Sequence, residues 1–450
     1  MARHDEQNQI TDGVICKQLL IFFFPIVFGT FFQQIYNTAD TVVVGRFVGK
    51  EALAAVGGSA SQIVNLIVGF FVGLCSGAGV VLSQFYGAQD KRNVKAALHT
   101  AFAFCIAAGV VLTAGGIILS RPLLLMMKTP ADVVEESVLY LHIYFGGIVF
   151  NLVYNMGAGL LRSVGDSRRP LYVLIITCLL NILMDILLVV VFRMGVTGVA
   201  LATVFCQAVS AVLVVWFLIR TREMYQLEPR SIRIHRNMLR MILHIGIPAG
   251  LESVMYNISN VLIQVFVNDL GTDTVAAWGT LGTIDALFWM VVNSFSIAIT
   301  TFVGQNYGAG KFDRMRKSVK VCMAMSFGGA AIISVLLMAS GSFIYSLFTT
   351  DQAVVAIGTH MLRFLLPCYS IYVVISILSG ALRGAGKVLV PMLLTCGGVC
   401  LLRILWLFGA VPVYPGIDTI MLSYPVSWSI TAVLFIIYYL KKFPKSLEDI

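Results

Sequence analysis

The sequence predicts an all-α polytopic membrane protein with twelve transmembrane helices in two six-helix lobes, related by a pseudo-two-fold axis along the membrane normal. Three observations predict this fold: the composition, a series of long apolar runs and an internal repeat. Of the 450 residues, 58% are hydrophobic and only 12% are charged, and the mean hydropathy is +0.90. Soluble domains carry about 25% charged residues, so most side chains here must face lipid or other helices.

The apolar runs define the expected spans. A membrane-spanning helix needs about 20 predominantly apolar residues. Suitable runs lie at 15–44, 52–82, 94–119, 133–161, 170–193, 196–219, 238–268, 275–303, 319–345, 354–382, 390–411 and 418–440. None of them alternates with the period of two that is typical of barrel strands. Helices are therefore the expected way to satisfy backbone hydrogen bonds in lipid.

The basic residues predict the topology. The termini and the even-numbered loops hold 24 of the 31 Lys and Arg, five lie on the other side, and two, Arg363 and Arg403, lie inside spans. By the positive-inside rule both termini are cytoplasmic and the number of spans is even. A multi-pass protein of the plasma (cytoplasmic) membrane is expected. The net charge of +9 is then a topology signal, and nucleic-acid binding is not expected.

The chain also repeats itself. SQFYGAQDKR at 83–92 resembles GQNYGAGKFD at 304–313, and GLLRSVGDSRRP at 159–170 resembles GALRGAGKVLVP at 380–391. Both pairs share an offset of 221 residues, whereas ALAAVG and TVAAWG align at 222. We therefore expect an N-lobe at 1–220, a basic cytoplasmic linker at 221–240 and a C-lobe at 241–450. Two copies of six spans have the same orientation, which favours a substrate site between them.

Two acidic residues inside the first lobe are the best candidates for chemistry, because a charge within the membrane is costly and usually functional. Asp40 and Asp185 lie on helices that run in the same direction, and both fall in the outer half of the membrane. Polar residues expected nearby are Tyr36, Asn37, Asn181 and Thr203. Carboxylate, amide and hydroxyl oxygens suit a hard cation such as Na⁺, and two crowded carboxylates also suit a proton carrier. Alternatively, each Asp only hydrogen-bonds a neighbouring helix.

The second lobe has its own charges within spans: Glu252, Asp285, Arg363 and Arg403. Internal salt bridges are one interpretation, because unpaired buried charges are unfavourable. A role in substrate binding or coupling is the other.

Helix-bending and helix-packing residues are also present. Pro25 and Pro248 occupy corresponding places in the first helix of each half, where proline removes a hydrogen bond and permits bending. Pro25 is either a static kink or a hinge. Gly69, Gly73 and Gly77 form a GxxxGxxxG pattern that predicts a close-packing helix face.

Signatures of an enzyme are absent from the sequence. It has no Walker A loop, HExxH or GxSxG pattern, and its nine Cys form no CxxC pair. We therefore expect no enzymatic activity and no cofactor, with H⁺ or Na⁺ as the coupling ion.

Three motifs carry a family resemblance: NTADTVVVGR at the end of the first span, GLLRSVGDSRRP after the fourth and NILMD in the fifth. With the two six-helix repeats, they make the chain resemble the multidrug and toxic compound extrusion (MATE) family, over residues 12–440. Asp40 and Asp185 match the acidic pair of its DinF-like prokaryotic branch. The resemblance implies alternating access and antiport of H⁺ or Na⁺ against cationic or aromatic organic compounds.

The resemblance also assigns residues. Asp40, Asn181, Asp185 and Thr203 match the N-lobe cation site and would be the ligands if the ion is Na⁺, and Pro25 matches a proline associated with bending. Glu252 and Asp285 depart from the C-lobe acidic positions of the NorM-like branch. The expected partners are small organic substrates and the lipid bilayer, and the expected state is a monomer. A lipid-linked oligosaccharide flippase of related architecture is the main alternative, while a membrane enzyme and a channel are less well supported.

Overall fold

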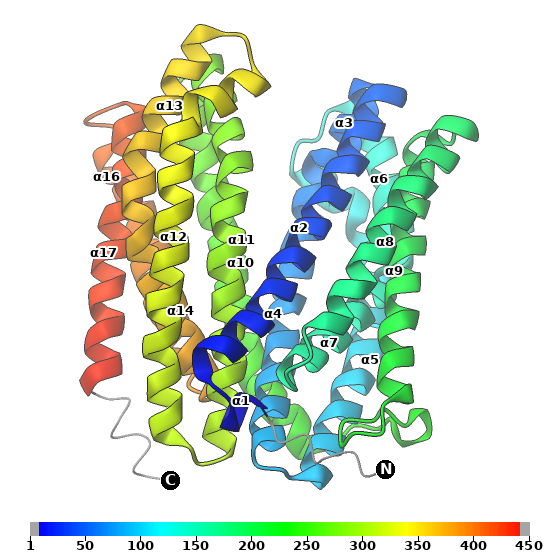
Figure 1. The fold of residues 1–450 in the computed structure, drawn as a ribbon. Coiled ribbons are helices and arrows are strands. Elements are labelled where there is room, and N and C mark those ends of the chain that lie inside the picture. Colours follow the sequence, from blue (N-terminus) through cyan, green and yellow to red (C-terminus); the bar gives the residue numbers. More distant parts are fainter. Residues whose placement is uncertain (1–8, 442–450) are drawn as a thin grey trace. The chain divides into compact units, whose positions relative to one another are not determined.

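The computed structural model describes residues 9–441 and is helical throughout (Figure 1). No β-strand occurs among these residues. In the first half of the chain the helices are α1 (Gln9–Asp12), α2 (Ile15–Phe47), α3 (Lys50–Gly57), α4 (Ser59–Gly87), α5 (Lys91–Met126), α6 (Ala131–Gly146), α7 (Ile148–Ser163), α8 (Arg168–Asp185) and α9 (Gly195–Arg220). A π-helical segment, Ile186–Val191, continues α8.

The second half has the helices α10 (Arg236–Asn268), α11 (Thr272–Gly308), α12 (Phe312–Phe348), α13 (Gln352–Leu365), α14 (Tyr369–Gly384), α15 (Leu389–Leu394), α16 (Leu402–Ala410) and α17 (Ile417–Lys441). A 3₁₀ turn, Leu366–Cys368, joins α13 to α14, and a π-helical segment, Thr395–Leu401, joins α15 to α16.

The predicted twelve-span, all-α membrane fold is confirmed. Within residues 9–441, eleven helical stretches are long and apolar enough to cross a membrane. The twelfth span is the pair α6 and α7, which meet at a bend of 51° next to Gly147. The corresponding span of the second half also breaks, at Cys368, which is 221 residues further along. The sequence predicted these spans but not their breaks.

The repeat extends to the backbone conformation of the turns. Residues with positive φ recur at the offset of the sequence repeat: Gln89 with Gly310, Gly165 with Gly386, Gly195 with Gly416, and, at 222 residues, Gly49 with Gly271. Glycine is favoured in this region because it has no Cβ to clash. The same loops therefore reverse the chain at the same places in both halves.

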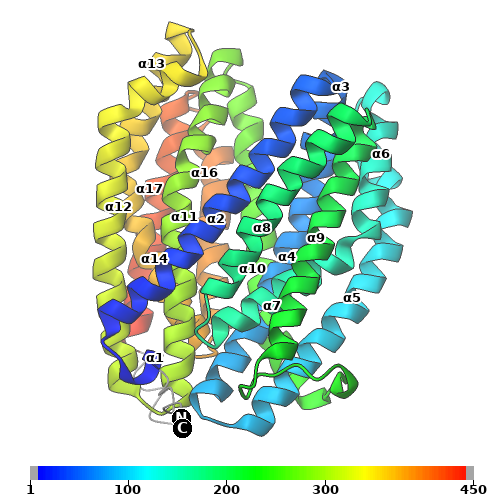
Figure 2. The same cartoon turned by 45° about the vertical axis from the view of Figure 1, so that its right-hand side comes forward.

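Packing divides the described chain into two compact units. The N-unit is Ile21–Gly250, and the C-unit is residues 9–20 and 251–441. Within the N-unit, α8 and α9 pack against each other, as two views show (Figures 1 and 2). The helices α2 and α10 each belong to both units, because α2 changes unit after Leu20 and α10 changes unit after Gly250.

Glycines bring α4 and the first part of α10 into backbone contact inside the N-unit. A Cβ on Gly73 would lie 2.4 Å from the Gly250 nitrogen, and one on Gly77 would lie 2.5 Å from the Gly246 nitrogen. The predicted close-packing face is thereby confirmed at these two glycines. Small residues at such a contact allow dispersion forces to hold helices together in lipid, where the hydrophobic effect does not.

The start of the chain is tied to the C-unit. The Arg314 side chain donates from Nε to the carbonyl oxygen of Ile10 at 3.1 Å and also donates to that of Gly13. Lys311 donates to the Thr11 carbonyl at 3.2 Å and pairs with the Asp12 carboxylate at 2.5 Å. The Lys311 hydrogen bond lowers the pKa of Asp12.

The 221–240 segment packs on the beginning of α5. Lys95 pairs with the Glu228 carboxylate, whose pKa is lowered by this hydrogen bond. His99 Nε2 accepts the Glu228 N–H at 3.0 Å, and the hydroxyl of Thr100 accepts the His235 N–H at 3.1 Å. The linker is therefore fixed to the N-unit by hydrogen bonds, and its position on the cytoplasmic membrane surface stays a prediction.

Replacing Gly77 with Ala should destabilise the N-unit, because the new methyl group would overlap the backbone at Gly246. Overpacking of this kind costs about 1–3 kcal/mol. Thermal unfolding of the purified protein in detergent measures the effect. Gly115→Ala is the matched control, since nothing lies within 4 Å of a Cβ there; equal melting temperatures for the two variants would contradict the predicted contact.

Acid should release the Asp12–Lys311 pair. Since the folded pKa of Asp12 lies below its ordinary value, the pair stabilises the fold above about pH 4 and loses this contribution as pH falls through the lowered pKa. Both side chains are about half exposed, so the contribution is below about 1 kcal/mol. Asp12→Asn should reduce the melting temperature at pH 6 and converge with the wild type near pH 2, whereas Lys311→Gln should lose more, because it also loses the hydrogen bond to the Thr11 carbonyl. A loss for Asp12→Asn that does not change with pH would contradict the pairing.

Candidate cation-binding site

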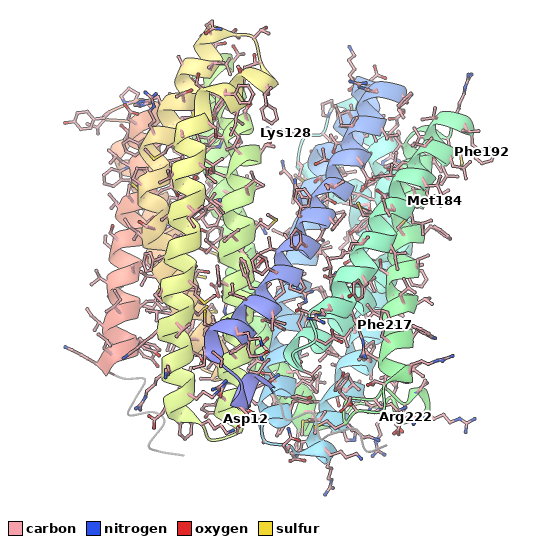
Figure 3. All side chains as sticks on the ribbon, viewed as in Figure 1. Asp12, Lys128, Met184, Phe192, Phe217 and Arg222 are labelled. Atoms are coloured by element: carbon pink, nitrogen blue, oxygen red, sulfur yellow. The ribbon has the colours of Figure 1, made fainter. Side chains whose placement is uncertain are left out.

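Three helices of the N-unit bring the predicted polar residues together. Tyr36 and Asp40 are four residues apart on α2, and Asn181 and Asp185 are four residues apart on α8, so each pair shares a helix face. Thr203 comes from α9, which packs on α8. Met184, directly before Asp185, lies nearer to Phe192 than to Phe217 (Figure 3). The site is thus toward the end of the N-unit that is remote from the 221–240 segment.

The site is largely closed to solvent. Asn181 and Asp185 are 0% exposed, and Thr203 is buried. The Thr203 hydroxyl donates to Asp40 Oδ2 at 3.5 Å. The Asp40 and Asp185 carboxyl groups are close enough to interact with each other, and Asn181 also approaches Asp40. The structure therefore unites both predicted aspartates with Asn181 and Thr203.

Several buried polar atoms of this group have no hydrogen bond to the protein. Buried atoms without a hydrogen bond are both oxygens of Asp185, Oδ1 of Asp40, the amide atoms of Asn181 and the hydroxyl of Tyr36. Most buried polar groups are paired, and an unpaired cluster calls for a specific explanation. A proton or a bound cation would supply the missing partner.

The donor set selects the kind of cation. Within residues 9–441 no group of three or more His, Cys, Asp and Glu side chains could hold a metal ion. Two carboxylates with amide and hydroxyl oxygens fit Na⁺, and the same two carboxylates can share a proton. Asp40, Asn181, Asp185 and Thr203 would hold the ion.

A π-helical segment lies next to the site. It begins at Ile186, directly after Asp185, and the Phe192 N–H donates to the Leu187 carbonyl at 2.9 Å. Segments of this kind often occur at functional positions of helices. Here the change in helical pitch follows the buried carboxylate immediately.

Gln207 and Tyr144 were not predicted from the sequence to lie near the site. Gln207 is one turn beyond Thr203 on α9, its Oε1 is buried without a partner, and its Nε2 donates to the Tyr144 hydroxyl at 3.5 Å. The Tyr144 ring stacks on Tyr140 with centroids 6.1 Å apart. The i, i+4 spacing from Thr203 was the available signal. Asn37, in contrast, is exposed.

The predicted charges of the second half do not pair with one another. The Tyr369 hydroxyl donates to Asp285. Glu252 lies 3.8 Å from Arg383, in the last turn of α14. Arg403 is 1% exposed, and its guanidinium stacks 4.1 Å from the centroid of the Tyr424 ring. Arg363 is exposed.

Aromatic rings fill the space between Asp285 and Arg403. The indole of Trp428 is completely buried and lies 5.3 Å from the Tyr424 ring, 5.8 Å from Tyr369 and 6.2 Å from Trp289, between centroids. These rings pack on one another and form a core. This cluster could not be predicted from the sequence, because its members come from the separate helices α11, α14 and α17.

A family model, MatE, matches residues 25–187 and again residues 248–408. The chain belongs to the MatE family. The two matches begin at Pro25 and Pro248, so the family relationship follows the internal repeat. The MATE resemblance of the sequence is thereby confirmed, and the chain is a multi-pass membrane transporter rather than an enzyme.

Named relatives and a solved structure agree. The chain is 28% identical over 85% of its length to "Probable multidrug resistance protein YoeA" of Bacillus subtilis (strain 168), covering 84% of that protein. It is also 28% identical to "Probable multidrug resistance protein YpnP" of the same strain, over 87% of this chain and 88% of that one. A multidrug resistance MATE family transporter in an outward-facing conformation has the same fold, with a TM-score of 0.92, 21% identity and complete coverage of both chains.

Cation binding at this site should stabilise the folded protein. A ligand at 100 times its dissociation constant adds about 2.7 kcal/mol, so the melting temperature of the wild type should rise with Na⁺ concentration or with falling pH. Asp185→Asn should lose that rise. Asp313→Asn is the control, because its carboxylate is fully exposed on α12. An unchanged response of Asp185→Asn would exclude this cluster as the ion site.

Proposed function

We propose that this protein is a secondary active multidrug efflux antiporter that exports cationic or aromatic organic compounds in exchange for H⁺ or Na⁺. The observation that carries the proposal is the cluster of buried, unpaired carboxylate oxygens at Asp40 and Asp185. The names of the relatives YoeA and YpnP, both probable multidrug resistance proteins, support the substrate class. The expected setting is the plasma membrane, with both termini cytoplasmic and the protein acting as a monomer.

The coupling mechanism follows from the cost of the unpaired charge. An outward-facing state admits a cation to Asp40 and Asp185, and the cation neutralises the pair. Neutralisation changes the packing of α2 and weakens the hold on the substrate, which leaves to the outside. The transporter then turns inward, releases the cation and loads a new substrate. The cation can drive this cycle only if it binds one state better than the other.

The position of Pro25 supports a hinge in α2. Proline has no N–H, so the carbonyl of Ile21 cannot receive its usual helix hydrogen bond. Ile21 is also the first residue of α2 that packs with the N-unit, whereas Leu20 packs with the C-unit. The weakest point of the helix and the change of unit therefore coincide.

Asp40→Asn should abolish gradient-driven efflux, because the amide cannot take up and release a positive charge. We expect at least a ten-fold loss of the initial rate in proteoliposomes loaded with a cationic dye. Na⁺ and pH gradients are imposed separately, which also identifies the ion. Asp313→Asn, with a similar charge change on an exposed surface, should transport at the wild-type rate.

Two results would refute the proposal. One is Asp40→Asn exporting dye at the wild-type rate. The other is wild-type flux that follows the dye gradient alone and ignores both ion gradients, which would indicate a channel.

A further inference from the structure

A small pocket lies beside Arg162, at the end of α7 in the N-unit. Its volume is about 40 Å³, and its walls come from α2, α7 and the start of α8, including Gly29, Tyr154 and Ser167. The Arg162 Nε donates to the Ala158 carbonyl of its own helix at 3.2 Å. Among residues 9–441, no carboxylate lies within ion-pair distance of this guanidinium. A cation inside a membrane protein is thus left without a counter-charge.

Two further donors face the same pocket. Tyr154 and Ser167 are buried, with 8% and 4% of their surfaces exposed, and both line the cavity. Neither hydroxyl forms a hydrogen bond with another residue in the described part of the chain. A guanidinium and two free hydroxyl groups around one space form a binding site for negatively charged oxygen atoms.

In the other half of the chain, the corresponding arginine has a carboxylate from the protein as its partner. Arg383 corresponds to Arg162 at the repeat offset of 221, and it pairs with Glu252 at 3.8 Å. Glu252 is four residues after Pro248, where the second family match begins. Four residues after Pro25, where the first match begins, the residue is Gly29. The first half therefore keeps the arginine and lacks the glutamate.

The two halves also differ at two positions that line the pocket in the first half. At the repeat offset, Tyr154 corresponds to Ile375 and Ser167 corresponds to Val388. Both of these apolar residues are buried. The half that contains its own carboxylate thus has apolar residues at these two positions, whereas the half without one has two hydroxyl groups. A simple loss of the glutamate would not explain the added hydroxyl groups.

We propose that the Arg162 pocket binds the carboxylate group of an organic ligand, in the place that Glu252 occupies beside Arg383. The volume suits one small group and leaves the rest of the ligand outside. Gly29 keeps the space open, since even a Cβ there would lie 3.1 Å from Leu174 Cδ1. That the bound ligand is a transported compound rests on the proposed function; that the pocket binds a carboxylate does not. Such a ligand extends the substrate class to aromatic compounds that carry a carboxylate.

The test measures binding of 1-pyrenebutyrate, a fluorescent carboxylate, to the purified full-length protein in neutral detergent. Its methyl ester has the same aromatic part without the charge. The acid should bind the wild type at least ten-fold more tightly than the ester does. Gly29→Glu should remove that preference, because the new carboxylate would pair with Arg162 as Glu252 pairs with Arg383. Gly29→Ala is the matched control and should keep it.

Arg162→Gln removes the positive charge without filling the pocket, so it tests the charge alone. It should also lose the preference for the acid, although it leaves the pocket open. Should this variant fail to fold, Gly29→Glu still decides, because it adds an ion pair and should keep the melting temperature of Gly29→Ala or exceed it. Equal binding of acid and ester to the wild type would overturn the proposal. So would Gly29→Glu binding the acid as tightly as Gly29→Ala.

Competition identifies the anion. Inorganic phosphate and vesicles containing phosphatidylglycerol should leave bound pyrenebutyrate in place, and displacement by either would make this a phosphate site instead. The binding assay needs no ion gradient. A wild type that exports dye but does not prefer the acid refutes only this inference. A wild type that binds the acid through Arg162 but ignores ion gradients refutes only the antiport.

Discussion

A carboxylate enclosed without a protein partner is the constraint on which the N-unit depends. Both oxygens of Asp185 and one of Asp40 are buried without hydrogen bonds, in surroundings where an uncompensated charge costs several kcal/mol, roughly 3–5 when a buried pair loses one partner. The fold tolerates this cost only because α2, α8 and α9 hold the two side chains in one place. An ion or proton that relieves the cost gains the same free energy, and a transporter can use that gain to favour one of its states.

The two halves place different buried charges on a common backbone. Their turns, breaks and arginines recur at one offset, and the same family model matches each of them. In the C-unit the buried charges have partners: Asp285 has Tyr369, Glu252 has Arg383, and Arg403 has the ring of Tyr424. In the described part of the N-unit, neither the aspartate pair nor Arg162 has an oppositely charged partner, although Thr203 donates to Asp40 and Arg162 donates to the Ala158 carbonyl. Charged side chains with a buried atom that lacks a hydrogen bond occur in both halves, at Asp40 and Asp185 in the N-unit and at Glu252, Asp285 and Arg403 in the C-unit.

Much of the fold and part of the site were accessible from the sequence. Hydrophobic length predicts the spans, and a fixed offset between motifs predicts the repeat. The i, i+4 spacing of Asn181 and Asp185 is enough to put them on one helix face. Which faces meet is a matter of tertiary packing, however, and single-sequence patterns do not contain it. This is why Gln207 was missed and why Glu252 could not be paired with Arg383.

The surroundings of Arg162 also could not be predicted from the sequence. In the sequence it is one of many basic residues near a helix end, and it contributes to the topology count. Only the structure shows that its head group faces a cavity rather than water. Conversely, Arg363 falls within a span by hydropathy but is exposed. The charge of a residue is readable from sequence, whereas its dielectric surroundings are not.

The division of α2 and α10 between the units has a mechanical consequence. A helix strongly resists stretching along its axis, because every turn is closed by hydrogen bonds, but it bends more easily where proline has removed one. The residues just before α2 are held by Lys311 and Arg314, and the first part of α10 contacts α4 at Gly246 and Gly250. The beginning of α2 thus belongs to the C-unit and its remainder to the N-unit, and the reverse holds for α10. Any reorientation between them must be absorbed as torsion and bending within a few residues, near 20–25 and 248–251.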